Sequence, residues 1–208
     1  IEEAVRLEED NAVLSSADFP EPHENKSDMP PPADGPLDAP SPEPEEEAPP
    51  TVAWSVRYKE ARQFLYGDAD TPPDFEEAYR LFIAEAGDGN ALAMYDLGRM
   101  FFDGIGRDAN SEQAQAWDSK ALAAFLAVER QKPNHYAEYR IGKMYAAGAG
   151  AEQDYEKTAE WLSKSAEQDY AYAQYSLAKL YSEGKGVSQD HKTARLLYEQ
   201  SAAKGFPY

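Results

Sequence analysis

Few residue patterns in this sequence have the types and spacing that catalysis needs. Two Ser-x-x-Lys pairs, Ser176 with Lys179 and Ser182 with Lys185, match the spacing of a serine hydrolase nucleophile and its lysine. The companion Ser-Asp-Asn and Lys-Thr-Gly elements of those enzymes do not occur in the sequence, so we interpret both pairs as coincidental. The sequence contains no cysteine, which excludes a disulfide framework and a thiol nucleophile.

The sequence also lacks clear motifs for binding a metal ion or a phosphate group. His23, His135 and His191 lie far apart and lack the spacing of metal ligands. Three Gly-x-Gly pairs lack the third glycine of a phosphate-binding loop, and they follow expected helices rather than strands. We therefore predict no catalytic residue, no metal site and no cofactor. An enzyme with a site between helices stays open as a less favoured alternative, since no acid–base pair stands out.

The composition divides the chain into two parts. Residues 1–53 contain 11 of the 15 prolines and 15 of the 39 acidic residues, but only two basic residues. Such a segment buries too little apolar area to offset its ordering entropy, so we predict a disordered, acidic, Pro-rich linker. Within it, Phe19–Pro50 should be extended and Ile1–Leu14 should form a short helix. The net charge of −19 argues against nucleic acid as a partner, and no apolar run is long enough to span a membrane.

The second part, residues 54–208, contains an internal repeat. Copies start at residues 93, 137 and 173, so they lie 44 and 36 residues apart. A period of this size indicates stacked helical units, because one unit cannot bury its apolar face alone. Equivalent positions in the three copies are Tyr95/Tyr139/Tyr175, Leu97/Ile141/Leu177, Phe101/Tyr145/Tyr181, Gly104/Gly148/Gly184, Gly106/Gly150/Gly186 and Trp117/Trp161/Leu197.

Each copy has the pattern of a helical hairpin. In the second copy, Ile141 and Tyr145 lie on one helical face, and the Gly148/Gly150 pair ends that helix. Asp154 is the expected N-cap of the following helix, and Asn110 and Asp190 take its place in the other copies. We predict a positive φ for at least one glycine of each pair. We also predict that the two tryptophans of the second helices, Trp117 and Trp161, are core residues.

These motifs resemble the Sel1-like repeat, a relative of the tetratricopeptide repeat. The shared pattern is A-x-Y-x-L-G-x-M-Y-x-x-G-x-G followed by D-x-x-K-A-x-x-W-x-x-K-A-A. The sequence departs from it at Ala178, Thr158, Thr193 and Leu197. The resemblance implies an all-α, right-handed superhelix of four hairpins. We place their boundaries at residues 54–90, 91–134, 135–170 and 171–206, and Glu60 at an apolar position suits a capping role for the first hairpin.

Eight extra residues separate the first and second copies. Apolar positions continue through Leu122, Phe125 and Val128 with no helix breaker before Pro133. The second helix of that hairpin should therefore run about two turns longer than its counterparts. Such an extension either covers its own neighbours or forms one wall of a groove.

The resemblance to the tetratricopeptide repeat implies which positions face the inside of the superhelix. These inner positions carry Tyr95, Tyr139 and Tyr175, then the basic residues Arg99, Lys143 and Lys179, and Phe102. Each basic residue follows a tyrosine by four positions and so shares its face. One interpretation is a shallow groove that binds a protein or an extended peptide with carboxylates. The other is that the long cations only cover the tyrosines while staying solvated.

The acidic cluster Glu43, Glu45, Glu46 and Glu47 precedes the repeats by seven residues. An extended linker advances about 3.1 Å per residue, so this cluster is a candidate for weak, salt-sensitive binding to the basic row.

The amino-acid sequence of residues 57–98 also resembles the C-terminal repeat region of relaxases from mobile elements of gut Firmicutes. That resemblance implies a parent protein with a nicking domain before the acidic linker, and a bacterial cytoplasmic location. The absence of a visible signal peptide, the lack of an initial methionine and the incomplete repeat at KGFPY lead us to expect a segment of a longer protein. The favoured function is a non-enzymatic binding scaffold, and the alternative is a structural spacer without its own ligand.

Overall fold

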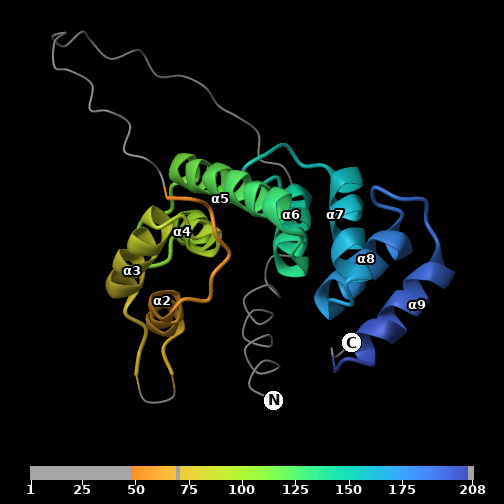
Figure 1. The fold of residues 1–208 in the computed structure, drawn as a ribbon, viewed down its shortest axis with the longest axis horizontal. Coiled ribbons are helices and arrows are strands. Elements are labelled where there is room, and N and C mark those ends of the chain that lie inside the picture. Colours follow the sequence, from red (N-terminus) through yellow and green to blue (C-terminus); the bar gives the residue numbers. More distant parts are fainter. Residues whose placement is uncertain (1–47, 69–70, 206–208) are drawn as a thin grey trace, which may run out of the picture. The chain divides into compact units, whose positions relative to one another are not determined.

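The computed structural model describes residues 48–68 and 71–205, and these form eight helices (Figure 1). The helix expected over residues 1–14, the acidic cluster and most of the predicted linker lie outside the described residues. The helices are α2 (Val56–Tyr66), α3 (Phe75–Gly87), α4 (Ala91–Asp103), α5 (Ser111–Gln131), α6 (His135–Ala147), α7 (Tyr155–Glu167), α8 (Ala171–Glu183) and α9 (His191–Ala202).

The helix boundaries follow the predicted capping residues. Asp74, Asn110, Asp154 and Asp190 each accept a hydrogen bond from a backbone N–H two or three residues later, at the starts of α3, α5, α7 and α9. All six glycines of the Gly-x-Gly pairs have a positive φ, between 68° and 75°. The predicted caps and the glycine conformation are therefore confirmed.

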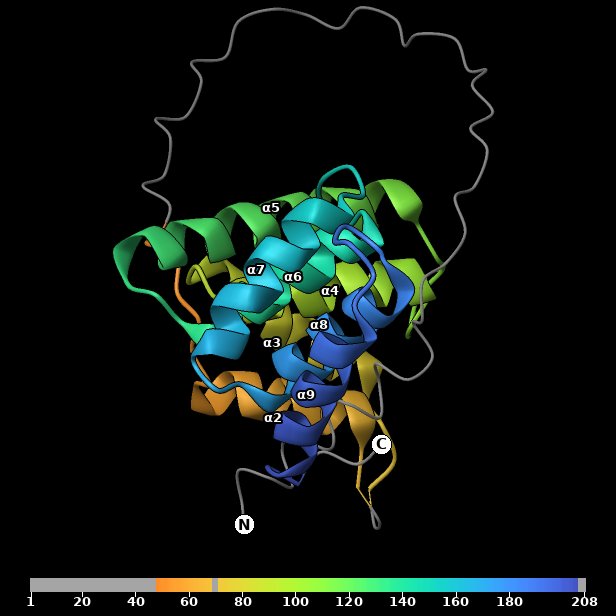
Figure 2. The ribbon, with the colours of Figure 1, turned by 90° about the vertical axis from the view of Figure 1, so that its right-hand side faces the viewer.

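Consecutive helices pair into four hairpins, α2–α3, α4–α5, α6–α7 and α8–α9, which stack in chain order. Within the described residues no strand forms, and helices contact mainly the helices next to them in the chain. Side chains from the first three hairpins make a continuous core that includes Phe82, Leu97, Phe125, Ile141 and Met144. In Figure 1, α2, α6 and α8 border the inside of the curve, with α3, α5 and α9 outside. Figure 2 shows the stack from α9. The predicted all-α repeat solenoid is confirmed.

The eight extra residues lengthen α5, which has 21 residues against 13 in α7, as predicted. They also displace the following hairpin. Gly106 and Gly186 lie against Phe75 and Tyr155, the first residues of α3 and α7, whereas Gly150 lies against Asp118, the eighth residue of α5. The hairpin α6–α7 is therefore shifted by about two turns, roughly 11 Å, along α5. That the end of α5 forms one wall of a groove stays a prediction.

Residues 48–53, which composition assigns to the linker, lie with Trp54 along the connection between α3 and α4. Thr51 forms an isolated parallel bridge there, donating to the Gly89 carbonyl and accepting from the Ala91 N–H, both at 2.9 Å. The side-chain amide of Asn90 donates to the Ala53 carbonyl at 2.8 Å. The Trp54 ring reaches Tyr136 at the start of α6, with ring centroids 6.0 Å apart. This segment therefore links the first hairpin to the third.

The prediction that both tryptophans are core residues is wrong in degree. Trp117 and Trp161 are only partly buried, and they pack against the edge of the core. The fully buried position is one residue later, where Leu162 is 1% exposed and faces Gly142. Helix geometry explains the error, because adjacent residues differ by about 100° in direction and only one of them can point into the hairpin.

Candidate functional site

The predicted inner-face residues all lie on the first helices of their hairpins, but their exposure differs. Tyr139 is buried, and Phe102 is 58% exposed. Tyr95, Arg99, Lys143, Tyr175 and Lys179 are intermediate. The assignment of these residues to partner binding stays a prediction. Arg99, Lys143 and Lys179 are the charged residues of the set, and all three are partly exposed.

Arg99 is held more tightly than its position in a basic row suggests. Its guanidinium donates to the Asp103 carboxylate, with Nη2 at 2.9 Å and Nε at 3.2 Å. Burial alone would lower the pKa of Arg99, but the charges and hydrogen bonds of Tyr95 and Asp103 raise that pKa overall. The buried Asp118 carboxyl, whose pKa burial raises to about 6, is a further nearby charge. Arg99 is therefore a fixed cation at the first hairpin with the full repeat pattern.

The structure adds a line of aromatic rings that sequence reasoning missed. The ring of Trp54 contacts Tyr136, Tyr136 contacts Tyr170 at 6.2 Å, and Tyr170 contacts Tyr172 at 5.4 Å. Tyr139 joins this line at 5.3 Å from Tyr170. These residues come from the first, third and fourth hairpins. Tyr136 and Tyr172 occupy equivalent positions, three residues before the repeated tyrosines. This recurrence of a tyrosine in the first turn of α6 and α8 is the sequence signal that could have indicated the aromatic line.

Tyr170 occupies a position where the second and third hairpins carry a capping asparagine. Asn90 and Asn134 cap α4 and α6 through their side chains, whereas Tyr170 makes no side-chain cap at α8. Its ring instead packs among Tyr136, Tyr139 and Tyr172. At α8 a side-chain capping hydrogen bond, worth about 1 kcal/mol, is thus replaced by contacts between aromatic rings.

A buried arginine lies beside this line. The Arg140 guanidinium sits 4.9 Å from the ring centroids of both Tyr95 and Tyr136, and it donates to the Tyr136 hydroxyl. Nearby on α4, Asp96 accepts a hydrogen bond of 2.7 Å from the Tyr58 hydroxyl. Burial, reinforced by the charge of Asp96, raises the pKa of Tyr58 well above its usual value. Polar and aromatic groups from α2, α4 and α6 therefore meet beside the aromatic line.

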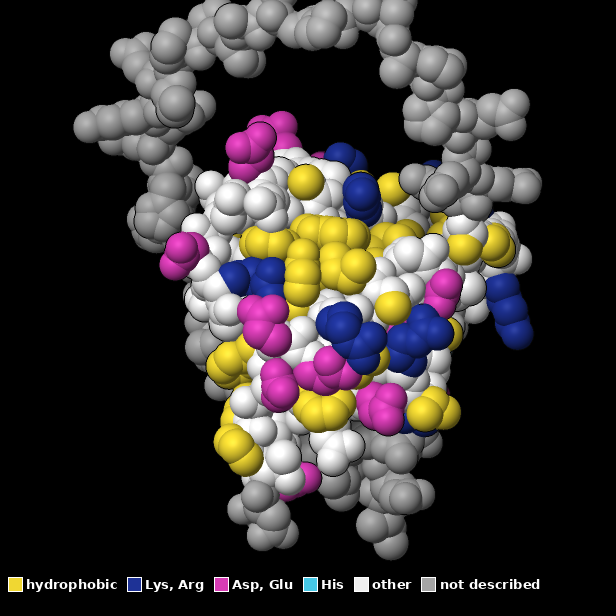
Figure 3. All heavy atoms as spheres, turned by 90° about the vertical axis from the view of Figure 1, so that its left-hand side faces the viewer, with side chains coloured by type: hydrophobic (Ala, Val, Ile, Leu, Met, Phe, Trp, Pro, Cys, Tyr) yellow, Lys and Arg dark blue, Asp and Glu magenta, His cyan; other side chains and the backbone are white. Residues whose placement is uncertain are grey.

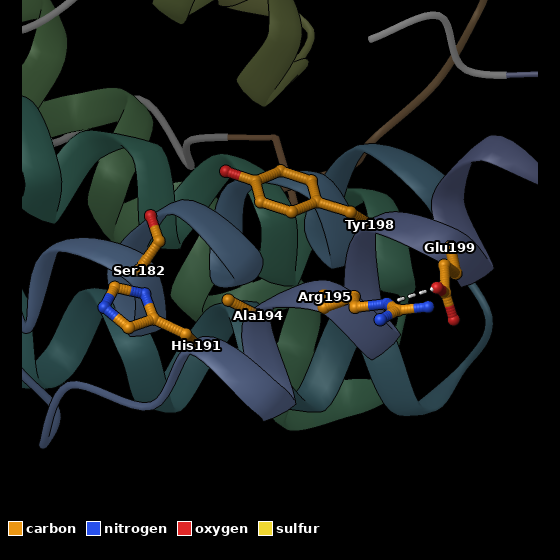
Figure 4. Close-up of a pocket in the computed structure, with 6 residues that line it drawn as sticks. All are labelled: Ser182, His191, Ala194, Arg195, Tyr198 and Glu199. Carbon is orange, nitrogen blue, oxygen red and sulfur yellow. Dashed lines mark hydrogen bonds and ion pairs between the residues drawn. The ribbon is translucent and has the colours of Figure 1, made fainter.

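Two hollows of the described surface lie away from the aromatic line. One, of about 390 Å³, lies between α8 and α9 (Figure 4) and is lined by Ser182, His191, Ala194, Arg195, Tyr198 and Glu199. Arg195 donates to Glu199 at 2.7 Å there, so the end of the array presents a polar surface. The other, of about 490 Å³, follows α3 from Asp74 to Ile83 on the face drawn in Figure 3, where apolar side chains gather beside charged ones. Ser182 and His191 both line the first hollow, but the Ser182 hydroxyl donates to the Lys179 carbonyl at 2.9 Å rather than to the His191 ring.

No group of three or more His, Cys, Asp or Glu side chains is placed to hold a metal ion in residues 48–68 and 71–205. None of the helices in that part of the chain is long and apolar enough to cross a membrane.

Comparison with known proteins identifies a family whose repeats match this sequence. The sequence matches the Sel1 repeat model at residues 64–84, 91–124, 135–170 and 171–206. A Sel1 repeat protein from Oxalobacter formigenes is similar in structure, with a TM-score of 0.55 and 24% identity over 72% of this chain and 58% of that one. A comparison with curated protein sequences found no match.

Two other solved structures are similar at lower scores. A protective antigen from uropathogenic Escherichia coli has a TM-score of 0.41 and 24% identity over 72% of this chain. An immunity protein from Pseudomonas aeruginosa has a TM-score of 0.42 and 20% identity over 76% of this chain and 68% of its own. The present chain spans only 38% of the Escherichia coli protein's length. The family match covers more than half of the sequence, and the chain belongs to the Sel1 repeat family.

Proposed function

We propose that this chain is a non-enzymatic scaffold whose first helices bind a protein or an extended peptide along the inner face of the array. The observation that carries the proposal is the repetition of a cation beside a tyrosine in three successive hairpins of a chain with a net charge of −19. A partner with regularly spaced carboxylates would meet Arg99, Lys143 and Lys179 in turn. The repeated tyrosines Tyr95 and Tyr175, which are partly exposed, would add aromatic contact area beside these cations.

The proposal is tested with the full chain and a library of displayed random 15-residue peptides as the probe. Peptides selected on the wild type are then measured against a triple variant, Arg99→Gln, Lys143→Gln and Lys179→Gln. The matched control is Lys157→Gln, Lys164→Gln and Arg195→Gln, which removes the same charge from the second helices. We expect selected peptides to be rich in Asp and Glu, and their affinity to fall at least tenfold in the first variant only. Equal affinities for the two variants would contradict the proposal.

We further propose that the chain is part of a mobile-element relaxase, in the bacterial cytoplasm. This rests on the resemblance of residues 57–98 alone, since no similar structure named above is described as a relaxase. The gene sequence upstream of Ile1 tests it. A nicking domain with a catalytic tyrosine and a histidine triad is the expected result, and any other domain there would refute the association.

A further inference from the structure

Two carboxyl groups meet where α5, α6 and α7 come together. Glu129 lies in the extended part of α5, and Glu138 lies on α6 with only 2% of its surface exposed. The Glu129 carboxyl acts on Glu138 through its charge and a side-chain hydrogen bond, and both interactions raise the pKa of Glu138. Glu129 also accepts from the backbone N–H of Asn134 at 3.1 Å, and Glu138 accepts from the side-chain amide of Gln168.

A hydrogen bond between two carboxyl groups requires a proton on one of them, because an ionised carboxylate only accepts. Burial raises the pKa of Glu138 to about 7, and the charge and hydrogen bond of Glu129 act in the same direction. The pair therefore holds one proton over a pH range in which an exposed glutamate is ionised.

The other charges around Glu138 do not supply a strong counter-ion. From α7, Lys164 lowers its pKa and Glu167 raises it, both less than Glu129 does. The Lys164 ammonium is paired with Glu160 at 3.0 Å and lies 3.9 Å from the Trp161 ring centroid. On α6 itself, the His135 ring packs against Tyr170 at 5.0 Å, and the Arg140 guanidinium is bonded to Tyr136.

The pair occurs at one joint of the array only, within the part the structure describes. The residues equivalent to Glu138 are Met94 in the second hairpin and Gln174 in the fourth, neither of which ionises. The joint is also where the long helix α5 displaces α6 by about two turns. The carboxyl pair therefore lies at the contact between the first two hairpins and the last two.

We propose that Glu129 and Glu138 form a pH-sensitive joint between the hairpins α2–α5 and α6–α9. With one proton the pair ties the end of α5 to the start of α6. Without it, the negative charge of the partly buried Glu129 acts on the buried negative charge of Glu138 and loosens this contact. Because the folded-state pKa is raised, the stabilisation is fully present below the ordinary pKa of 4.5 and is lost as the pH rises through about 7.

The test uses the full chain, unfolded with urea at pH 5.5 and at pH 8.5. The variants are Glu138→Gln, which keeps the shape and removes the charge, and Glu167→Gln, which removes a nearby charge outside the pair. Asp118 also titrates in this window, so the relevant quantity is the difference between wild type and E138Q. Linkage predicts that the unfolding equilibrium constant of the wild type rises about thirtyfold more than that of E138Q. E167Q should behave like the wild type.

Two further measurements on the unmodified chain locate the effect. Carbon-13 NMR of the glutamate carboxyls should show Glu138 titrating near pH 7. Hydrogen-exchange protection factors should fall between pH 5.5 and 8.5 at residues 126–139, and much less at residues 191–202. A Glu138 carboxyl that titrates below pH 5, or an E138Q variant with the pH dependence of the wild type, would overturn the proposal. A uniform loss of protection would exclude a local joint.

Discussion

Replacing Gly186 by alanine should destabilise the fold far more than replacing Gly184, although both glycines have a positive φ near 70°. A Cβ at position 186 would lie 2.0 Å from the Tyr155 carbonyl oxygen, which belongs to the backbone of the preceding hairpin. The backbone cannot move aside without opening the joint between hairpins. We expect a loss of about 3 kcal/mol or more for Gly186→Ala, from the strained φ and the overpacking together.

Gly184→Ala is the matched control, because the nearest atom to a Cβ there is a side-chain atom of Gln189 at 3.1 Å. Its cost should be about 1 kcal/mol, the usual penalty for the left-handed conformation. The same contrast should hold for Gly150 and Gly148, where the distances are 2.4 Å to a backbone oxygen and 3.5 Å. Chemical denaturation of the four variants measures the difference. Equal costs within each pair would show that the second glycines are not contact points between hairpins.

Replacing Asp118 by leucine should stabilise the protein at pH 8. Asp118 is 8% exposed and faces Gly98, in the position where Leu162 faces Gly142 in the next hairpin. Burial raises the pKa of Asp118 from 3.8 to about 6, with the Arg99 charge opposing that rise. The charged carboxylate therefore costs about 2–3 kcal/mol in the folded state above pH 6, and leucine removes that cost.

The pH dependence gives this prediction its sign. A raised pKa means that stability is fully present below pH 3.8 and is lost as the pH rises through about 6. Asp118→Leu should remove that part of the pH dependence, as measured by urea unfolding at pH 4 and pH 8. The reverse exchange, Leu162→Asp, should cost more than 3 kcal/mol at pH 8. A destabilised Asp118→Leu variant would mean that the carboxylate supports the hairpin.

The repeat pattern predicted the order of the helices because its signals are local. Asp154 and Asp190 cap the helices that follow them, and a glycine pair ends each preceding helix in three hairpins. These features depend on backbone groups within a few residues, so one sequence suffices to locate them. The two extra turns of α5 were predictable for the same reason.

Contacts between helices were harder to predict. The tryptophans match the family pattern, yet the buried neighbour is Leu162, since the direction of a side chain within a hairpin depends on the crossing of two helices. The displacement of α6 along α5 is invisible in the period of the repeat. Thr51 is held by backbone hydrogen bonds to Gly89 and Ala91, which do not depend on its side chain. The Pro-rich composition around it therefore led to the incorrect prediction of a disordered linker at this position.

The candidate site was predicted in part. The cations and tyrosines that we assign to the inner face recur at a fixed spacing, and this assignment stays a prediction. The contact between Trp54 and Tyr136 joins residues 82 positions apart in hairpins that are not neighbours, so no periodicity reveals it. Arg140 was missed because its equivalents are Asp96 and Ser176, which share no chemistry with it.

The proposed function is tested most directly by locating a bound peptide on the chain. Backbone amide NMR shifts of the full protein are recorded with and without an acidic peptide from the displayed library. The account predicts that shifts change around Arg99, Lys143 and Lys179 on α4, α6 and α8, while α7 and the outer side of α9 keep theirs. Changes confined to the second helices, with those three residues unaffected, would contradict binding along the inner face.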